Sequence, residues 1–188
     1  KPGEIKKLTK LISPHIGVIT NIGEAHLENF RNISCIAKAK SEIIENIKSG
    51  GTIILNRDDK FFNFLSKKAK KYNLKITTFG KHKEADVHIN KIIRNGNKSE
   101  LFIKINKQKI NLKIKDLNIY NVLSSLALLT ELGLNVFKLK SKFKHLESLE
   151  GRGKKYSILR YRKKFKFIDE SYNANPLSVK NAINKLTL

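Results

Sequence analysis

The segment TNIGEAHLENFRNISCIAKAKSE, residues 20–42, follows a short apolar run, IGVI, at residues 16–19. The run predicts a buried strand over residues 16–22, and the segment then carries Asn21 and His26 ahead of a helix that contains Lys40. Polar groups just past the carboxyl end of a buried strand are typical of ligand sites in open α/β sheets. This segment therefore predicts both an α/β fold and the place of a site.

Strand and helix patterns alternate along the chain that follows. We expect a helix over residues 33–47, a strand over 52–55, a helix over 61–72 and a strand over 75–79. The helix over residues 33–47 is expected to place four apolar side chains in the core: Ile36, Ile43, Ile44 and Ile47. Such alternation indicates a mostly parallel sheet covered by helices.

The pattern changes at residue 86. Between residues 86 and 115 apolar and polar residues alternate at period two, which predicts an antiparallel meander with one solvent-facing side. Helices are then expected over residues 119–132 and 136–149. The core positions expected in the second are Phe137, Leu139, Phe143 and Leu146.

A glycine-rich turn, Gly-Arg-Gly at residues 151–153, marks the predicted domain boundary. Beyond it we expect a β-hairpin over residues 155–160 and 164–169, then a helix from about residue 176. We therefore divide the chain into one domain over residues 1–150 and the beginning of another α/β domain over residues 151–188. Since the chain does not begin with Met, we interpret it as an internal piece of a longer protein.

The composition excludes several classes of protein. The single cysteine, Cys35, rules out a disulfide framework, and no stretch is apolar enough to span a bilayer. The net charge of +23 raises the alternative of a nucleic-acid-binding module. Against it, lysines are spread over nearly every segment and are not interleaved with aromatic stacking platforms. We therefore expect no specific nucleic-acid partner.

Two stretches resemble the Mur ligase family, and within it most closely the MurF type. The first is the His-Leu-Glu to Ala-Lys-Ala-Lys-Ser-Glu pattern of residues 26–42, and the second is Asp-Glu-Ser-Tyr-Asn-Ala-Asn-Pro at residues 169–176. The resemblance covers essentially the whole chain. It implies that residues 1–150 are the C-terminal part of a central ATP-binding domain and that residues 151–188 begin a Rossmann-like C-terminal ligase domain.

The resemblance also implies an activity. Enzymes of this type use ATP and Mg²⁺ to join D-alanyl-D-alanine to UDP-N-acetylmuramoyl-tripeptide through an acyl phosphate, in peptidoglycan precursor synthesis. A monomer in the bacterial cytoplasm would be expected. The alternatives left open are another Mur ligase or a folylpolyglutamate synthase, and the sequence does not indicate which diamino acid the tripeptide carries.

By the same resemblance His26 is a Mg²⁺ ligand and Lys40 is a carbamylated lysine, both of them catalytic. A carbamate ligates Mg²⁺ as a carboxylate does, whereas an unmodified lysine repels a cation. Without the resemblance, Lys40 would be an ordinary solvated helix charge, and Lys38 is the neighbour most easily confused with it. Glu28 could orient His26.

Further residues match positions that contact ATP or substrate in the family. Asn21 is expected to line the phosphate region, or else only to form a turn. Asn121 matches an adenine contact, while Asn118 reads as an N-cap. Arg152 matches a phosphate-binding arginine, and either Asp169 or Glu170 matches the acidic residue that binds ribose. Three substrate-side residues complete the motif: Tyr172, Asn173 and Asn175.

One motif is missing from these residues. No Gly-x-x-x-x-Gly-Lys-Ser/Thr sequence occurs, so the chain has no phosphate-cradling P-loop of its own. We expect the 188 residues alone neither to hydrolyse ATP nor to form an amide bond.

Overall fold

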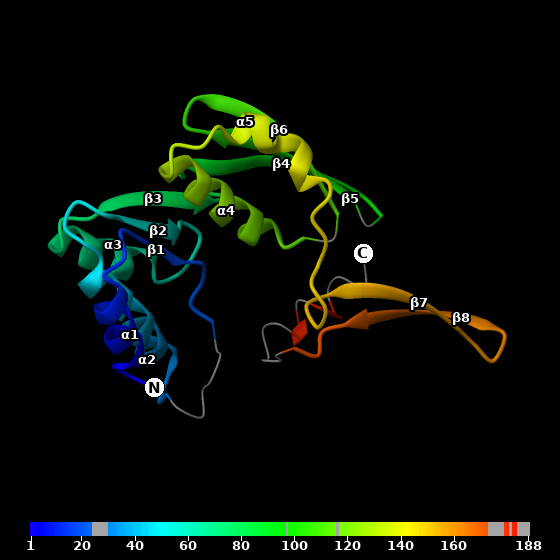
Figure 1. The fold of residues 1–188 in the computed structure, drawn as a ribbon, viewed down its shortest axis with the longest axis horizontal. Coiled ribbons are helices and arrows are strands. Elements are labelled where there is room, and N and C mark those ends of the chain that lie inside the picture. The colour runs from blue at the N-terminus through cyan, green and yellow to red at the C-terminus, as the bar shows by residue number, and fades with distance from the viewer. Residues whose placement is uncertain (24–29, 97, 116, 173–178, 181, 184–188) are drawn as a thin grey trace.

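The structure is a computed structural model and describes residues 1–23, 30–96, 98–115, 117–172, 179–180 and 182–183. Its main body is a six-stranded sheet in the order β1-β2-β3-β4-β5-β6, with helices on both faces of its first half (Figure 1). A separate two-stranded sheet, β7-β8, lies apart from that body in the same view. No described helix has the length and apolar character needed to cross a membrane.

The first half of the sheet is parallel, as its strand-helix alternation predicts. Strands β1 (Ile16–Ile19), β2 (Thr52–Asn56) and β3 (Lys75–Gly80) pair in that order. Between them run α2 (Ile33–Lys40), the 3-10 helix η2 (Ser41–Asn46) and α3 (Phe62–Lys71).

Strand β2 is buried along its whole length because both of its faces are covered. Ile53 and Leu55 pack with α2 and α3, whereas Ile54 belongs to the core on the opposite face of the sheet. Alternating side chains of one strand thus serve two cores, which explains its unbroken apolar run.

The second half of the sheet is the expected meander, formed by β4 (Val87–Asn95), β5 (Lys98–Ile105) and β6 (Gln108–Lys115). It continues the parallel sheet because β4 runs beside the last two residues of β3. The Asp86 carboxylate fixes this junction by accepting hydrogen bonds from the Thr78 N–H, at 2.7 Å, and the Thr78 hydroxyl, at 2.6 Å.

Helix α4 (Ile119–Glu131) covers the face of the sheet opposite α2 and α3, and α5 (Val136–Phe143) lies along β6. Glu131, at the end of α4, accepts hydrogen bonds from Thr77 at 2.6 Å and Lys75 at 2.9 Å. Burial acts most strongly on the Glu131 pKa and raises it, but the hydrogen bonds from Thr77 and Lys75 outweigh burial and leave this pKa below its ordinary 4.5. This carboxylate therefore stays ionised and joins the helix to β3.

The remaining elements lie at the two ends of the chain. Helix α1 (Glu4–Ile12) rests on η2, where the Glu42 carboxylate accepts the Gly3 N–H at 2.7 Å. At the other end β7 (Lys154–Arg160) and β8 (Lys163–Asp169) form the expected hairpin.

Three predicted elements differ from the structure. The strand expected over residues 16–22 ends at Ile19, because the backbone beyond it bonds to the side chains of Asn56 and Asp59 instead of a neighbouring strand. The helix expected over residues 33–47 tightens to 3-10 geometry at Ser41, whose hydroxyl bonds the Lys38 carbonyl at 2.7 Å. Of its expected core residues, three are buried and Ile43 is only partly so.

The helix expected over residues 136–149 ends at Phe143, and only i→i+3 bonds continue to Leu146. Of the four expected core positions, Phe143 is buried and Leu139 is partly buried, whereas Phe137 and Leu146 are exposed. Burial of Leu146 therefore does not stabilise a longer helix. The helix expected from residue 176 lies mostly outside the described residues.

Candidate active site

The carboxyl ends of β1, β2 and β3 meet at one edge of the sheet, because these strands are parallel. Thr20 and Asn21 follow β1, the Asp58-Asp59 pair follows β2, and Lys81 follows β3. Of the site residues predicted within residues 1–150, Asn21 and Lys40 lie at this edge, whereas His26 lies outside the described residues.

Lys40 reaches this edge from the last turn of α2. Its ammonium group donates a hydrogen bond to the Asn21 carbonyl oxygen at 2.9 Å, across 19 residues of sequence. Together with Thr20, the two residues line a hollow of about 220 Å³. The structure thus brings Asn21 and Lys40, two residues singled out separately in the sequence, into direct contact.

The environment of Lys40 lowers the pKa of its side-chain amine. The side chain is partly buried, and burial lowers the Lys40 pKa below its usual 10.5, while the negative charge of Asp59 partly opposes that change. Removal of an ammonium group from water disfavours the charge it carries. Lys38, two residues earlier, is exposed at the surface, so the structure separates the two lysines that the sequence left easy to confuse.

Asp59 holds the loop after β1 in place, a role that sequence reasoning missed. One carboxylate oxygen accepts the Ile22 N–H at 2.7 Å and the other accepts the Phe61 N–H at 2.8 Å. The Asn56 side-chain amide donates to the Thr20 carbonyl at 3.1 Å. The available signal was the Asn-Arg-Asp-Asp run directly after a buried strand, since such residues bond to local backbone.

Asp58 is the second missed residue, and it joins three segments. Its carboxylate accepts the N–H groups of Lys81, at 2.6 Å, and His82, at 2.9 Å, and the Tyr120 hydroxyl at 3.0 Å. Partial burial and then the hydrogen bond to Asp58 raise the pKa of Tyr120 to about 12. The tyrosine therefore remains a neutral donor at any physiological pH.

Asn121 lies next to Tyr120, in the first turn of α4. Asn118 is the N-cap, as expected: its side-chain oxygen accepts the N–H groups of Tyr120 at 2.9 Å and Asn121 at 3.3 Å. The Asn121 residue is exposed, and no partner of its amide is present among the described residues. The Asn121 side-chain amide is therefore available to bind a ligand.

The remaining predicted residues gather at the base of the β7–β8 hairpin. The Asp169 carboxylate accepts the Gly151 N–H at 2.9 Å, and the Asp169 carbonyl accepts the Gly153 N–H at 2.7 Å. The Tyr172 N–H donates a hydrogen bond to the Gly151 carbonyl at 3.1 Å. The Gly-Arg-Gly turn and the Asp-Glu-Ser-Tyr motif are thus packed together as one unit.

Arg152 lies over the Tyr172 ring, with its guanidinium carbon 4.0 Å from the ring centroid. Hydrogen bonds from the Ser171 hydroxyl, and then from the backbone N–H groups of Gly151 and Ser171, lower the pKa of Asp169. Both oxygens of the Asp169 carboxylate are therefore used in hydrogen bonds to Gly151 and Ser171. Glu170 has no hydrogen-bond or ion-pair partner in the part of the chain that the structure describes.

Three predicted site residues, His26, Asn173 and Asn175, lie outside the described residues, as does Glu28. Within the described ranges, no group of three or more His, Cys, Asp or Glu side chains could hold a metal ion. The predicted metal site depends on His26, so its full ligand set is not defined by the described part.

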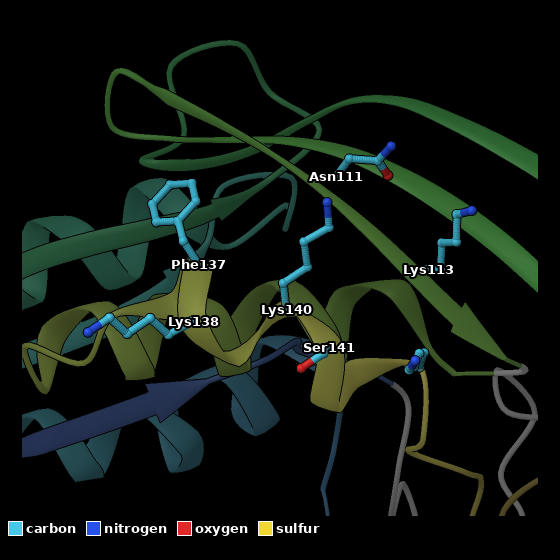
Figure 2. Close-up of a pocket in the computed structure, with 7 residues that line it drawn as sticks. Asn111, Lys113, Phe137, Lys138, Lys140 and Ser141 are labelled. Carbon is cyan, nitrogen blue, oxygen red and sulfur yellow. The ribbon is translucent and has the colours of Figure 1, made fainter.

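A different pocket, of about 370 Å³, lies between α5 and the edge strand β6 (Figure 2). It is lined by Asn111, Lys113, Phe137, Lys138, Lys140, Ser141 and Lys144, and includes none of the predicted site residues. Of its lysines, Lys113 lies on the edge strand β6, where a lysine is a common protection against strand-to-strand association. We therefore place the candidate site at the carboxyl edge of the parallel strands and not here.

Comparison with known proteins identifies the family of the chain. The family model for the Mur ligase middle domain matches residues 1–129 of the chain. The chain belongs to the Mur ligase family. Among curated Mur ligases it is 30% identical over 190 residues to the UDP-N-acetylmuramoyl-tripeptide--D-alanyl-D-alanine ligase of Rickettsia prowazekii (strain Madrid E). That alignment covers 98% of this chain and 41% of the relative.

Solved Mur ligase structures share the fold. MurF from Acinetobacter baumannii matches 99% of this chain with a TM-score of 0.86 and 27% identity, over 40% of its own length. MurF from Thermotoga maritima, solved in complex with ADP, matches 100% of this chain with a TM-score of 0.80 and 25% identity, over 42% of its length. The chain thus spans about two fifths of the Mur ligases it matches.

Proposed function

We propose that the chain is the part of a MurF-type ligase that binds ATP beside a carbamylated lysine. The whole enzyme would join D-alanyl-D-alanine to UDP-N-acetylmuramoyl-tripeptide through an acyl phosphate, as a monomer in the bacterial cytoplasm with no specific nucleic-acid partner. The observation that carries the proposal is the partly buried Lys40 amine, which faces Asn21 at the carboxyl edge of the sheet.

Lys40 has the chemistry that carbamylation requires. Its neutral amine attacks CO₂, a nitrogen–carbon bond forms, and the nitrogen loses a proton to give an anionic carbamate. Since only the unprotonated amine reacts, the lowered Lys40 pKa increases the reactive fraction at neutral pH. The carbamate oxygens and His26 would hold Mg²⁺, which when bound supplies positive charge near the phosphates.

The nucleotide would lie between the residues at the carboxyl edge of the parallel strands and those at the base of the β7–β8 hairpin. Asn121 is proposed to contact adenine, Asn21 to line the phosphate region, and Arg152 to bind phosphate oxygens through its planar guanidinium. Because Asp169 is occupied by the turn, we assign the ribose contact to Glu170, whose carboxylate is unengaged in the described part. Tyr172, with Asn173 and Asn175 beyond it, would form the substrate side.

The same contacts support the proposed division into domains. Gly151 and Gly153 bond to Asp169, on the far strand of the hairpin, so the turn belongs with the segment that follows it. We therefore keep the boundary at about residue 150, with residues 1–150 in the ATP-binding domain and residues 151–188 beginning the ligase domain.

The test is ATP-dependent phosphate release by the full-length enzyme, with D-alanyl-D-alanine, L-alanine or glutamate as the acceptor. We expect turnover that depends on the nucleotide-linked tripeptide and on D-alanyl-D-alanine. Turnover with L-alanine or glutamate instead would point to another Mur ligase or to a folylpolyglutamate synthase, and would refute the assignment.

Lys40 is tested in the same assay by a matched pair of variants. K40R keeps a positive charge but cannot form a carbamate, and we expect kcat to fall about 10²-fold or more. K38R alters the exposed neighbour on the same helix and should keep kcat within about twofold, since exposed substitutions seldom perturb a site. A carbamate carbon signal in ¹³C-bicarbonate should be present in K38R and absent in K40R. Equal kcat in the two variants would contradict the role of Lys40.

A further inference from the structure

Asp58 and Tyr120 form a contact between segments 62 residues apart, and neither residue has a role in the function proposed above. The Asp58 carboxylate is held in place by bonds other than the one from Tyr120. Two backbone N–H groups of the loop after β3, those of Lys81 and His82, point at its oxygens at 2.6 and 2.9 Å. A carboxylate fixed in this way loses little further freedom when it accepts a third bond.

Gly80 shows how closely this carboxylate is packed. A Cβ atom at Gly80 would lie 2.7 Å from one Asp58 oxygen, and the backbone there has a φ of +153°. The carboxylate thus rests on a position where any larger residue would displace it. The arrangement is a built acceptor for the Tyr120 hydroxyl at the edge of the parallel strands.

The backbones of Tyr120 and Asn121 are linked through the N-cap of α4. Asn118 accepts the N–H groups of both Tyr120 and Asn121 with the same side-chain oxygen. Because the two backbones share this acceptor, a shift of Tyr120 would also act on the neighbouring Asn121. The rest of α4 is fixed separately, because Leu123, Leu126 and Ala127 are fully buried in the core.

We propose that Tyr120 is a positioning residue, whose hydroxyl bond to Asp58 fixes the first turn of α4 so that Asn121 faces the nucleotide. The inference rests on the proposed function, in which Asn121 contacts adenine. Tyr120 itself touches no reacting atom. Loss of the Tyr120 hydroxyl should weaken the binding of ATP and leave the binding of D-alanyl-D-alanine unchanged.

The experiment is a double-mutant cycle on the full-length enzyme, with Y120F, N121A and the combined variant. We expect Y120F to raise the KM for ATP roughly 3- to 10-fold, the effect of losing one hydrogen bond of ordinary net strength. The KM for D-alanyl-D-alanine should not change. In the N121A background the same Y120F substitution should change the KM for ATP by less than about twofold, because coupled residues are not additive.

Y72F is the matched control, since Tyr72 is 42% exposed and its hydroxyl has no hydrogen-bond partner among the described residues. It should leave both KM values unchanged. A Y120F effect of equal size with and without Asn121 would overturn the inference, because it would show a structural role independent of that residue. No effect of Y120F on the KM for ATP would overturn it as well. Failure of the wild-type enzyme to use ATP would instead refute the proposed function, and the inference with it.

Discussion

Asp59 offers a direct test of how the candidate site is held together. Its two carboxylate oxygens accept different backbone N–H groups, those of Ile22 and Phe61, at 2.7 and 2.8 Å. In D59N the amide keeps one acceptor oxygen and turns an NH₂ group toward the other N–H. One of the two donors must then lose its partner.

The expected cost follows from that geometry. A buried donor left without an acceptor costs about 1–3 kcal/mol, so we expect D59N to lower the free energy of unfolding by about 2 kcal/mol. Asp86 supplies a matched control, because both of its bonds from Thr78 use the same oxygen. An Asn at position 86 can present its carbonyl there and lose no partner, so D86N should cost roughly 0.5–1 kcal/mol.

The assay is urea denaturation of the 188-residue chain followed by circular dichroism, with wild type, D59N and D86N compared at one pH. The reasoning predicts a clearly lower midpoint for D59N than for D86N. Equal losses in the two variants would refute it, because they would show that only the lost charge matters and not the number of oxygens in use.

Two further predictions concern single contacts. Replacement of Glu131 by Gln should lower the free energy of unfolding at pH 7 by about 1–2 kcal/mol. Because folding lowers the pKa of Glu131, its carboxylate stabilises the fold above pH 4.5. The difference from wild type should vanish as the pH falls through the folded pKa. Denaturation at a series of pH values measures this, and a difference that persists in acid would contradict it. G151A should reduce hydrogen-exchange protection of the β7–β8 hairpin, since a Cβ at Gly151 would lie 2.8 Å from that of Tyr172, whereas G133A, at a similar φ with nothing within 4 Å, should leave the hairpin unchanged. Equal loss of hairpin protection in both variants would show that the contact with Tyr172 is unimportant.

Much of the fold was predictable from the sequence because it is governed by local patterns. β2, β3, α3 and the meander follow from apolar periodicity, and the structure confirms each of them. The errors are at the ends of elements. β1 stops three residues early because the side chains of Asn56, at the end of β2, and Asp59, in the following loop, bond to the backbone after it; a pattern within β1 carries no information about those side chains.

The candidate site was predictable to a lesser degree, for a related reason. Lys40 and Asn21 were found through a resemblance, and their contact across 19 residues is present in the structure. Asp58 and Tyr120 were missed because each acquires its role from a partner 62 residues away. Composition and spacing describe neighbours in sequence, whereas these two residues are defined by neighbours in space.

The distribution of acidic residues also bears on the basic character of the chain. Only 16 acidic residues accompany 39 lysines and arginines, and several of these acids bond to the backbone of the fold. Glu42, Asp58, Asp59 and Asp169 each accept two backbone N–H groups and so tie a helix start or a loop to another segment. Carboxylates suit this task because they accept several bonds at once, whereas lysine can only donate. The positive field that remains outside would attract the phosphates and carboxylates of the proposed substrates without any need for a nucleic-acid partner.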